Sequence, residues 1–288
     1  MFGVITIVGL GLIGGSYGLA IRERKLAERV IGVSRRETTL AAALRCGACD
    51  EATDDLIAGS HDADLIILCA PVTTISERAA MLADVIPPEC VVTDAGSTKA
   101  TLVRQCEIAL AGKARFVGGH PMAGSELTGI AHARADLFAG AIYALTRTQH
   151  TDDAAFTLVH DFARALGAKP LTIDPAVHDE VVALTSHLPH AVAFALASAV
   201  WGGHPNKSAL ASLAASGYRD TTRLAGASPE LWCDIFTANR DALLHAFDGF
   251  QSELSALRAA LAAGDDAALL RALKQANERR ASLLRSIA

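Results

Sequence analysis

The segment from Gly118 to Glu126 (GGHPMAGSE) combines residue types that can transfer a proton within a glycine-rich turn. It holds one imidazole, that of His120, and the carboxylate of Glu126 follows six residues later. Glycine lets the backbone approach a ligand closely and adopt positive φ angles. Histidine titrates near neutral pH and is a common general base. The spacing alone fits equally well a proton-transfer site and a turn with a solvated histidine.

A second chemical signal is the Gly-x-Gly-x-x-Gly pattern of residues 9–14 (GLGLIG). It follows a predicted strand, Val4–Val8, and opens a predicted helix from about Ile13 to Arg24, which is the context of a dinucleotide-binding turn. There the first glycine allows the tight turn, the second lets the backbone reach a pyrophosphate, and the third permits close helix–strand packing. The alternative is a glycine-rich turn without a ligand. The predicted cofactor-binding residues here are Gly9, Gly11, Leu12, Ile13 and Gly14, with Pro71 after a later strand.

The predicted second strand, Arg29–Val33, is followed by Ser34, Arg35 and Arg36. NAD-specific sites usually place an acidic residue here to bind the ribose 2′-hydroxyl. A hydroxyl and two guanidinium groups would instead hold a 2′-phosphate. The segment therefore predicts a preference for NADP, with NAD still possible; the alternative is two solvated arginines at a strand end.

Three further segments concentrate polar residues. DAGSTK ends at Lys99 and begins at the carboxyl end of a predicted strand, Val91–Asp94, where open α/β sheets bind ligands. SHLPH (186–190) and GYRDTTR (217–223) lie in the second half. Arg219 and Arg223 are four residues apart and so share a helix face, from which they can bind carboxylates bidentately. A solvated basic face is the alternative.

With these motifs together, the chain resembles the prephenate/arogenate dehydrogenase family of tyrosine biosynthesis. GLGLIGGS, DAGSTK, GGHPMAGSE, SHLPH, GYRDTTR and SPELW occur in the family's order from residue 9 to residue 232. The resemblance implies an NAD(P)-dependent oxidative decarboxylation of a small molecule. Hydride leaves C4 of a cyclohexadienol ring, the 4-hydroxyl loses its proton and carbon dioxide departs. Prephenate gives 4-hydroxyphenylpyruvate and arogenate gives tyrosine.

The resemblance also implies roles for individual residues. His120 matches the catalytic base, and Ser97 matches the serine that orients it and the substrate hydroxyl. Three of these residues have structural alternatives of equal weight. Glu126 could be an ordinary carboxylate at a helix start, and Trp232 could be a core aromatic. His190 could form a structural pair with His187. The residues assigned to substrate binding are Arg223, Arg219, Ser186, His190, Glu126 and Trp232.

Signals for the substrate conflict. His190 resembles members that use prephenate, whereas Arg219 and the Ser-Arg-Arg segment resemble arogenate enzymes that use NADP. The sequence favours prephenate, with arogenate possible or shared. We expect neither a chorismate mutase segment before the first half nor a regulatory domain after the second, so feedback by tyrosine would act at the active site.

The elements that must position these residues change character near Ile173. Before it, apolar runs alternate with helical patterns, which predicts a Rossmann-type, doubly wound parallel α/β sheet. After it, apolar residues recur at three and four positions, which predicts only helices, among them one long helix over Pro229–Phe250. We therefore expect a dinucleotide-binding domain over 1–170 and an all-α substrate and dimerisation domain over 171–288. A homodimer through the helical half is expected, the alternative being a monomer.

Composition narrows the remaining classes. The chain has 288 residues, 51% of them hydrophobic, and a formal net charge of −5. No basic patch with interleaved aromatics indicates nucleic acid, and the apolar runs fall short of a membrane span. Cys46 and Cys49 form a CxxC pair without a second pair at metal spacing, so no metal site is expected. These features predict a cytoplasmic enzyme without membrane or nucleic-acid partners.

Two other functions stay open at this point. A β-hydroxyacid dehydrogenase or imine reductase shares the arrangement of a Rossmann half and a helical dimer half. Such enzymes usually rely on a lysine in the helical half, where this chain offers Arg219 and Arg223. A non-catalytic NADP-sensing protein is the third hypothesis, but a sensor has no need of a base such as His120.

Overall fold

The computed structural model describes residues 1–125 and 127–287. The chain divides into two compact units, Met1–Arg240 and Asp241–Ala288. The first unit contains every motif described above, apart from Glu126, which lies outside the described residues.

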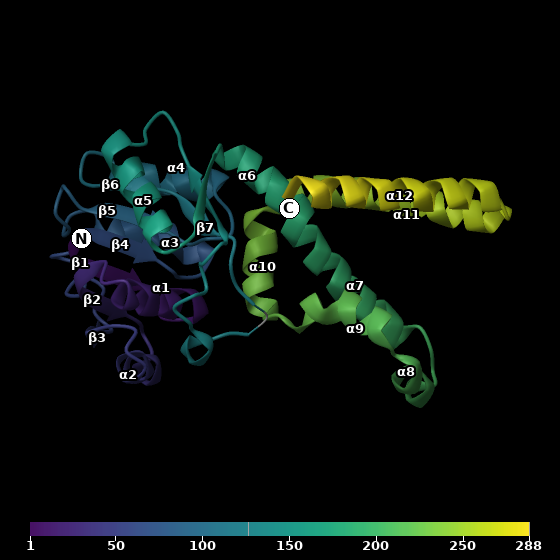
Figure 1. Ribbon diagram of the computed structural model, residues 1–288, viewed down its shortest axis with the longest axis horizontal. Helices are drawn as coiled ribbons and strands as arrows, with labels where there is room; N and C mark the ends of the chain where they lie inside the picture. The colour runs from purple at the N-terminus through teal and green to yellow at the C-terminus, as the bar shows by residue number, and fades with distance from the viewer. Residues whose placement is uncertain (126, 288) are drawn as a thin grey trace. The chain divides into compact units, whose positions relative to one another are not determined.

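Six parallel strands form the main sheet of the first unit, in the order β3-β2-β1-β4-β5-β6 (Figure 1). The strand order reverses direction between β1 and β4, which creates the switch point where ligands bind in such sheets. The doubly wound sheet predicted from the sequence is therefore confirmed. The strands are β1 (Phe2–Val8), β2 (Ala27–Val33), β3 (Glu51–Thr53), β4 (Leu65–Leu68), β5 (Val91–Asp94) and β6 (Arg115–Val117).

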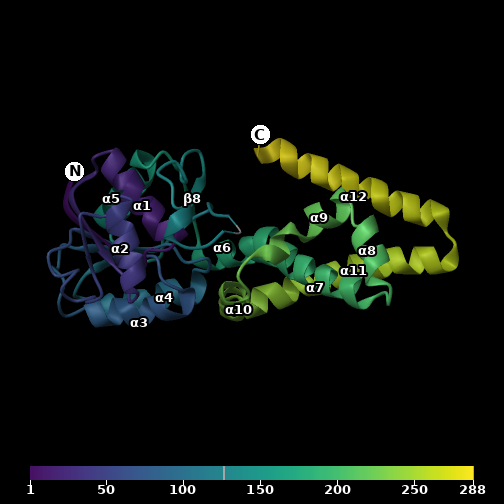
Figure 2. The same cartoon turned by 90° about the horizontal axis from the view of Figure 1, so that it is seen from below.

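Alternating side chains of the strands fill two separate cores. Ile5 of β1 and Ile67 of β4 belong to one core, whereas Val8 and Ile66 belong to the other. Because successive side chains of a strand point to opposite faces, both faces are apolar and both need helices. Figure 2 shows the two helical layers on opposite sides of the sheet. The layers contain α1 (Leu12–Glu23), α2 (Glu37–Arg45) and α5 (Asp153–Ala165) on one side, and α3 (Val72–Leu82) and α4 (Ala100–Leu110) on the other.

A second sheet of three strands corrects the predicted arrangement after β6. β7 (Gly119–Pro121) pairs antiparallel with β8 (Ile142–Thr146), which pairs parallel with β9 (Lys169–Ile173). The sequence predicted a single parallel sheet and did not predict β9. A strand of this sheet, β7, carries His120, so the catalytic candidate has a fixed backbone rather than the free turn its glycines suggested.

From residue 174 to residue 240 the described chain contains helices and turns but no strand, as predicted. The prediction of one helix over Pro229–Phe250 was wrong in one respect, because the chain forms two helices there, separated at Asn239. The elements are α6 (Pro175–Val182), a π-helical turn (Ala183–His187), α7 (Leu188–Gly202), α8 (Lys207–Leu213), α9 (Ser216–Thr222), a 3₁₀ turn (Arg223–Gly226) and α10 (Pro229–Ala238).

The π-helical turn joins α6 and α7 into one continuous helix, Pro175–Gly202. This 28-residue helix is long and apolar enough, by length and composition alone, to cross a membrane, and 22% of its most apolar window is buried. The sequence-based statement that all apolar runs fall short of a span therefore does not hold for this helix. The same helix carries His178, Asp179, His187 and His190, which an ordinary lipid-facing span would not accommodate.

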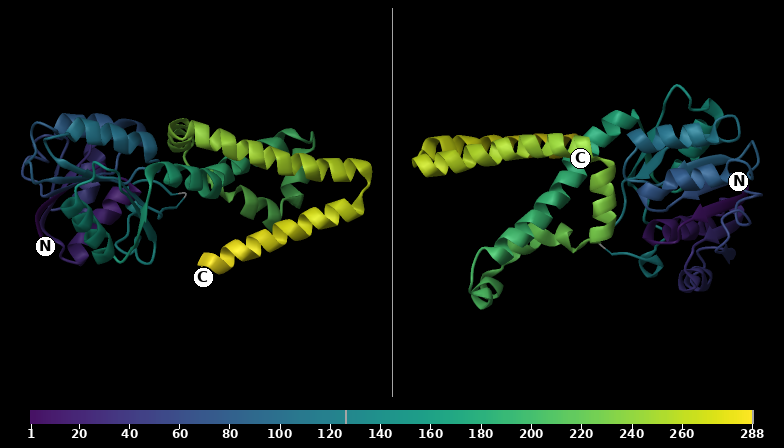
Figure 3. Two further views of the ribbon diagram at one scale, coloured as in Figure 1. Left: turned by 90° about the horizontal axis from the view of Figure 1, so that it is seen from above. Right: turned by 180° about the vertical axis from the view of Figure 1, so that it is seen from behind.

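The second unit is a pair of long helices that turn back on one another (Figure 3). α11 (Arg240–Ala263) ends at Gly264, whose φ of 64° is the left-handed conformation favoured by glycine at a helix end. α12 (Asp266–Ile287) then returns, and Arg279 forms an ion pair with Glu253 of α11.

Candidate functional site

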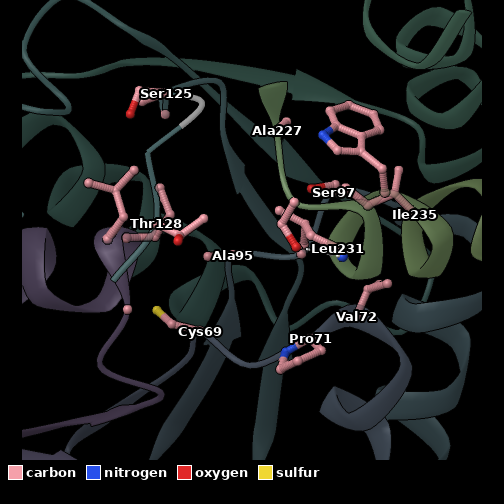
Figure 4. A pocket seen from close by; sticks show the side chains of 18 of the residues that line it. Cys69, Pro71, Val72, Ala95, Ser97, Ser125, Thr128, Ala227, Leu231 and Ile235 are labelled. Carbon is pink, nitrogen blue, oxygen red and sulfur yellow. Dashed lines mark hydrogen bonds between the residues drawn. The ribbon is translucent and has the colours of Figure 1, made fainter. Parts of the chain in front are cut away.

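A cavity of about 740 Å³ lies within the first unit, at the carboxyl ends of β1, β4 and β5 (Figure 4). This volume lies within the usual range for sites that bind small molecules and cofactors. On one side it is lined by the glycine turn and by the segments after β4 and β5. On the other side it is lined by α7, the 3₁₀ turn and α10, with His120 and the chain after it between them.

The glycine turn has the geometry that a bound dinucleotide requires. Gly9 has a φ of 102°, and a Cβ on it would overlap the carbonyl of Cys69; a Cβ on Gly14 would overlap the carbonyl of Gly9. Gly11, in contrast, lines the cavity, and apart from its chain neighbours no described residue has an atom within 4 Å of where its Cβ would be. Among the described residues no side chain caps the start of α1 at Gly11, so the first amides of the helix can donate to a phosphate. These residues therefore fit an NAD(P) pyrophosphate.

The other predicted cofactor residues fall into two groups. Leu12, Ile13 and Pro71 line the cavity together with Gly11 and Gly14. Ser34, Arg35 and Arg36 do not line the cavity. They follow the end of β2, where the adenosine end of a dinucleotide lies in this fold. Both arginines are exposed.

A third arginine in this region was missed by the sequence reasoning. The Nε atom of Arg78, on α3, is buried and has no hydrogen-bond partner among the described residues. Burial and then the positive charge of Arg35 lower its pKa, so the two guanidinium groups repel one another. Nothing in the sequence distinguishes Arg78 from other charges on a helix, because only the fold brings α3 toward the end of β2.

The strand that carries His120 is fixed to the end of β5 by Asp94. This fully buried carboxylate accepts hydrogen bonds from the backbone NH of Gly96 (2.7 Å) and of Gly119 (3.0 Å). It also forms an ion pair with Lys99, which is equally buried. A Cβ on Gly118 would overlap the Thr146 side chain, so this glycine serves close packing of the protein rather than approach to a ligand.

His120 is the first member of a hydrogen-bonded chain that leads away from the cavity. Its Nδ1 lies 2.9 Å from Nε2 of His178, and Nδ1 of His178 lies 2.8 Å from Oδ1 of Asp179. Asp179 also accepts the backbone NH groups of Lys99 (2.7 Å) and Ala100 (2.8 Å) at the start of α4. Sequence reasoning missed His178 and Asp179, although an adjacent His-Asp pair on a predicted helix was the available signal.

The environment keeps His120 uncharged at neutral pH. Burial lowers its pKa well below 6.5, and the neighbouring His178, Lys99 and His187 lower it further. The side chain is nevertheless partly exposed toward the cavity that it lines. Because Nδ1 faces His178, Nε2 is the nitrogen left to accept a proton from a molecule in the cavity.

The opposite side of the cavity is aromatic and basic. The ring of His190 stacks on Trp232 with centroids 3.5 Å apart, and its Nδ1 lies 2.9 Å from the carbonyl oxygen of Ser186. Burial and the charge of Arg223 lower the pKa of His190. Ser186, His190, Arg223 and Trp232 all line the cavity. Trp232 is buried and lines the cavity at once, so both of its predicted environments apply.

His187, the other histidine of the SHLPH segment, is buried and also contributes to the lining of the cavity. Its Nδ1 lies 3.1 Å from Nδ2 of Asn239, which also donates to the backbone carbonyl of Asp179 (2.8 Å). Burial lowers the pKa of His187 to about 4. The Asn239 side chain thus ties the π-helical turn to α6 at the point where the histidine chain ends.

The remaining predicted site residues are distributed unevenly. Ser97 lines the cavity with His120, although no hydrogen bond joins the two in the part of the chain that the structure describes. Arg219 is exposed on α9 and is not among the lining residues. α9 ends at Thr222, so Arg223 starts a tighter 3₁₀ turn and reaches the cavity on its own. Glu126 lies outside the described residues.

Comparison with known proteins gives a consistent result over the whole chain. Residues 17–172 match the family described as "Prephenate dehydrogenase, nucleotide-binding domain", and residues 174–275 match "Prephenate dehydrogenase, dimerization domain". The chain is 36% identical to the prephenate dehydrogenase of Bacillus subtilis (strain 168), over 97% of this chain and 76% of that protein.

Two solved structures are similar over nearly their full length. One is prephenate dehydrogenase from Aquifex aeolicus in complex with hydroxyphenyl propionate and NAD+, with a TM-score of 0.92 and 31% identity. That match covers 98% of this chain and 99% of the other. The second is the arogenate dehydrogenase of Synechocystis, with a TM-score of 0.81 and 35% identity over 97% and 99% of the two chains.

Proposed function

The chain belongs to the prephenate dehydrogenase family, and we propose that it catalyses the NAD(P)-dependent oxidative decarboxylation of prephenate, of arogenate or of both. The observation that carries this proposal is the position of His120. His120 lines a cavity that has a dinucleotide turn on one side and Arg223 on the other, and its Nε2 has no hydrogen-bond partner among the described residues.

The chemistry divides between cofactor and protein. The turn from Gly9 to Gly14 would hold a nicotinamide dinucleotide, which would supply the hydride acceptor for C4 of the substrate ring. His120 accepts the proton of the 4-hydroxyl at Nε2, and this transfer helps the C4 carbonyl to form as the hydride leaves. Ser97, which lines the same cavity, is placed to hold the hydroxyl by its own hydrogen bond. Loss of the ring carboxylate as carbon dioxide then completes an aromatic ring, which supplies the driving force.

Substrate positioning falls to the opposite side of the cavity. Arg223 binds a substrate carboxylate, and a guanidinium can do so bidentately. Trp232 and His190 offer a stacked apolar surface to the substrate, and Ser186 lies at its edge. We propose that Arg219 supports substrate binding only from outside the cavity, because it is exposed on α9.

We favour prephenate over arogenate, with shared use possible. Arogenate carries an ammonium group where prephenate carries a keto group, and a site for it benefits from a nearby carboxylate. Among the described residues that line the cavity, none is Asp or Glu, and the histidine at position 190 has a lowered pKa. Relatives of both kinds are similar to this chain, a prephenate dehydrogenase at 36% identity and an arogenate dehydrogenase at 35%.

We also propose a preference for NADP over NAD. Ser34, Arg35 and Arg36 follow β2 where the ribose of the adenosine half binds in this fold. Arg78 adds a third guanidinium close to Arg35, and the mutual repulsion of the two is relieved when a dianionic phosphate binds. Replacing Arg35 by Asp should reverse the ratio of kcat/KM values for NADP and NAD, whereas the same change at the exposed Arg134 should leave it unaltered.

We propose that the protein is a cytoplasmic enzyme and that its helical half forms a homodimer. The region matches a dimerization domain, and within the first unit it exposes large apolar side chains such as Leu184, Trp201 and Leu213. A second copy covering this surface explains why the helix Pro175–Gly202 is apolar yet only 22% buried over its most apolar window. We still propose a dinucleotide-binding part over 1–170 and a substrate and dimerisation part over 171–288, although β9 (Lys169–Ile173) continues across this boundary. Light scattering should give twice the chain mass of 30.0 kDa; a 30.0 kDa species would refute the dimer.

The activity is tested by incubating the protein with prephenate or arogenate and with NADP or NAD, in all four combinations. The absorbance of the reduced cofactor should rise in at least one of them, fastest with prephenate and NADP. Reduction with a β-hydroxyacid, but with neither cyclohexadienol, would favour the alternative dehydrogenase. Cofactor binding without turnover on any of these substrates would favour a sensor.

A further inference from the structure

The hydrogen-bonded chain behind His120 allows a deduction about where its protons lie. Asp179 accepts backbone NH groups on both carboxylate oxygens, from Lys99 at 2.7 Å and from Ala100 at 2.8 Å. It is therefore held as an acceptor, and the nitrogen of His178 that faces it must carry a hydrogen. A neutral His178 with its hydrogen on Nδ1 has a lone pair on Nε2.

That lone pair faces Nδ1 of His120 at 2.9 Å. Two nitrogen atoms at this distance need one hydrogen between them, and the lone pair on His178 leaves His120 as the donor. His120 then carries its hydrogen on Nδ1 and its lone pair on Nε2. The carboxylate of Asp179, two residues away in the chain of contacts, thus selects the one tautomer of His120 that can act as a base toward the cavity.

We infer that His178 is a positioning residue for the proposed reaction: with Asp179 it fixes His120 as the Nδ1–H tautomer and shares the positive charge that His120 acquires. The inference rests on the proposed function for the identity of the proton donor, the 4-hydroxyl. The oxygen–hydrogen bond breaks and a bond to Nε2 of His120 forms. The hydrogen on Nδ1 moves toward Nε2 of His178, whose own Nδ1–H stays bonded to the Asp179 carboxylate.

The surroundings make this arrangement more than a packing contact. His178 is only 1% exposed, so water cannot take the place of its imidazole as the partner of His120. The buried cation of Lys99 already has a counter-ion in Asp94, and it disfavours a charge that stays on His120. Asp179 lies against His178 rather than His120, so the charge is better stabilised on the ring that contacts the carboxylate, one ring farther from the cavity.

Three substitutions at position 178 distinguish a role in positioning His120 from a purely structural role. His178→Asn can still donate to Asp179 but cannot reach His120, and it should lower kcat about 10–100-fold, the range for losing a hydrogen bond to a charged group. His178→Gln can present an amide oxygen to the Nδ1–H of His120 and should recover part of that loss. His178→Phe keeps the ring volume but has no acceptor, so its kcat should fall as much as that of His178→Asn. KM and the affinity for NADPH should stay close to those of the unmodified protein.

A spectroscopic measurement tests the same claim without a substrate. Nitrogen-15 NMR of the imidazole rings in the full-length protein should show both His120 and His178 as Nδ1–H tautomers, assigned by the loss of signals in His120→Asn and His178→Asn. The nearby titratable or charged groups are Lys99, Asp94, Asp179 and His187, so the spectrum is best recorded near neutral pH, where the lowered pKa of His120 keeps it uncharged.

An Nε2–H tautomer for His120 would overturn the inference, as would a His178→Asn enzyme with the kcat of the original. A loss confined to KM or to cofactor affinity would also overturn it, because that pattern indicates a structural defect. These outcomes are distinct from failure of the proposed function, which would be seen as no reduction of cofactor by the unmodified protein with either cyclohexadienol. If the variants do not fold, the tautomer in the unmodified protein decides.

Discussion

The two sides of the cavity are defined by different parts of the chain. On the cofactor side, the turn from Gly9 to Gly14 works through its backbone, and the absence of side chains is what lets it fit. On the substrate side, His120, Arg223 and Trp232 work through side chains. His120 contacts His178, which does not line the cavity, and Trp232 stacks on His190, which does. Changes on the first side should therefore affect folding and cofactor binding, and changes on the second should affect turnover and substrate binding.

The largest effect is expected at His120. His120→Asn removes the proton acceptor, and kcat should fall by about 10²–10⁴, the usual contribution of a general base. Binding of NADPH, measured by fluorescence quenching, should be retained, because the asparagine leaves the glycine turn untouched. Near-normal kcat in this variant would remove the basis for treating the two sides as chemically different.

Arg223→Ala tests the part of the substrate side that binds without reacting. Loss of a charge-assisted contact to a substrate carboxylate should raise KM about 10–100-fold with a smaller change in kcat. Steady-state kinetics at saturating cofactor measure both values. Arg219→Ala is the control, since Arg219 is exposed and outside the cavity. Equal effects of the two variants would contradict the separation of these arginines seen in the structure.

Gly14→Ala tests the cofactor side. Its added methyl group would overlap the Gly9 carbonyl, so the protein should lose about 1–3 kcal/mol of stability, the usual cost of overpacking. Thermal or urea unfolding measures this loss. Gly11→Ala is the matched control: beyond its chain neighbours its Cβ meets no atom of a described residue within 4 Å, so stability should be nearly unchanged while cofactor affinity falls. A stable Gly14→Ala protein would show that the turn can relax.

The smallest effect is a displacement of the pH profile. The pKa of His120 lies below 6.5, so the base is already deprotonated at pH 6.5 and loses its function only when the pH falls through that lower pKa. The acid limb of kcat/KM should therefore lie below pH 6.5. A limb centred at or above 6.5 would indicate that burial, His178 and Lys99 do not control this histidine. On the cofactor side, NADPH affinity should not follow the same limb.

The sequence predicted the two sides unequally. The glycine turn was readable because its spacing and its place after a strand are local, and the parallel sheet followed from continuous apolar strands. His178, Asp179 and Arg78 were not found, since each acquires its role from a partner distant in the chain: 58 residues separate His178 from His120. The second sheet was missed because β9 contains Pro170 and is largely exposed, so it lacks the continuous apolar pattern of the parallel strands.

Arg219 and Arg223 show a limit of periodicity. Their spacing of four residues predicted a shared helix face, but α9 ends between them, and only Arg223 reaches the cavity. The pattern could not separate the two residues, because the end of the helix depends on how the chain packs and not on the two arginines.

The central claim, that His120 serves an oxidative decarboxylation, is tested most directly by stoichiometry. Prephenate labelled in its ring carboxylate is mixed with the protein and NADP, and released carbon dioxide and reduced cofactor are counted together. We predict one molecule of carbon dioxide for each cofactor reduced, with both falling in parallel in His120→Asn. Cofactor reduction without release of carbon dioxide would contradict the account.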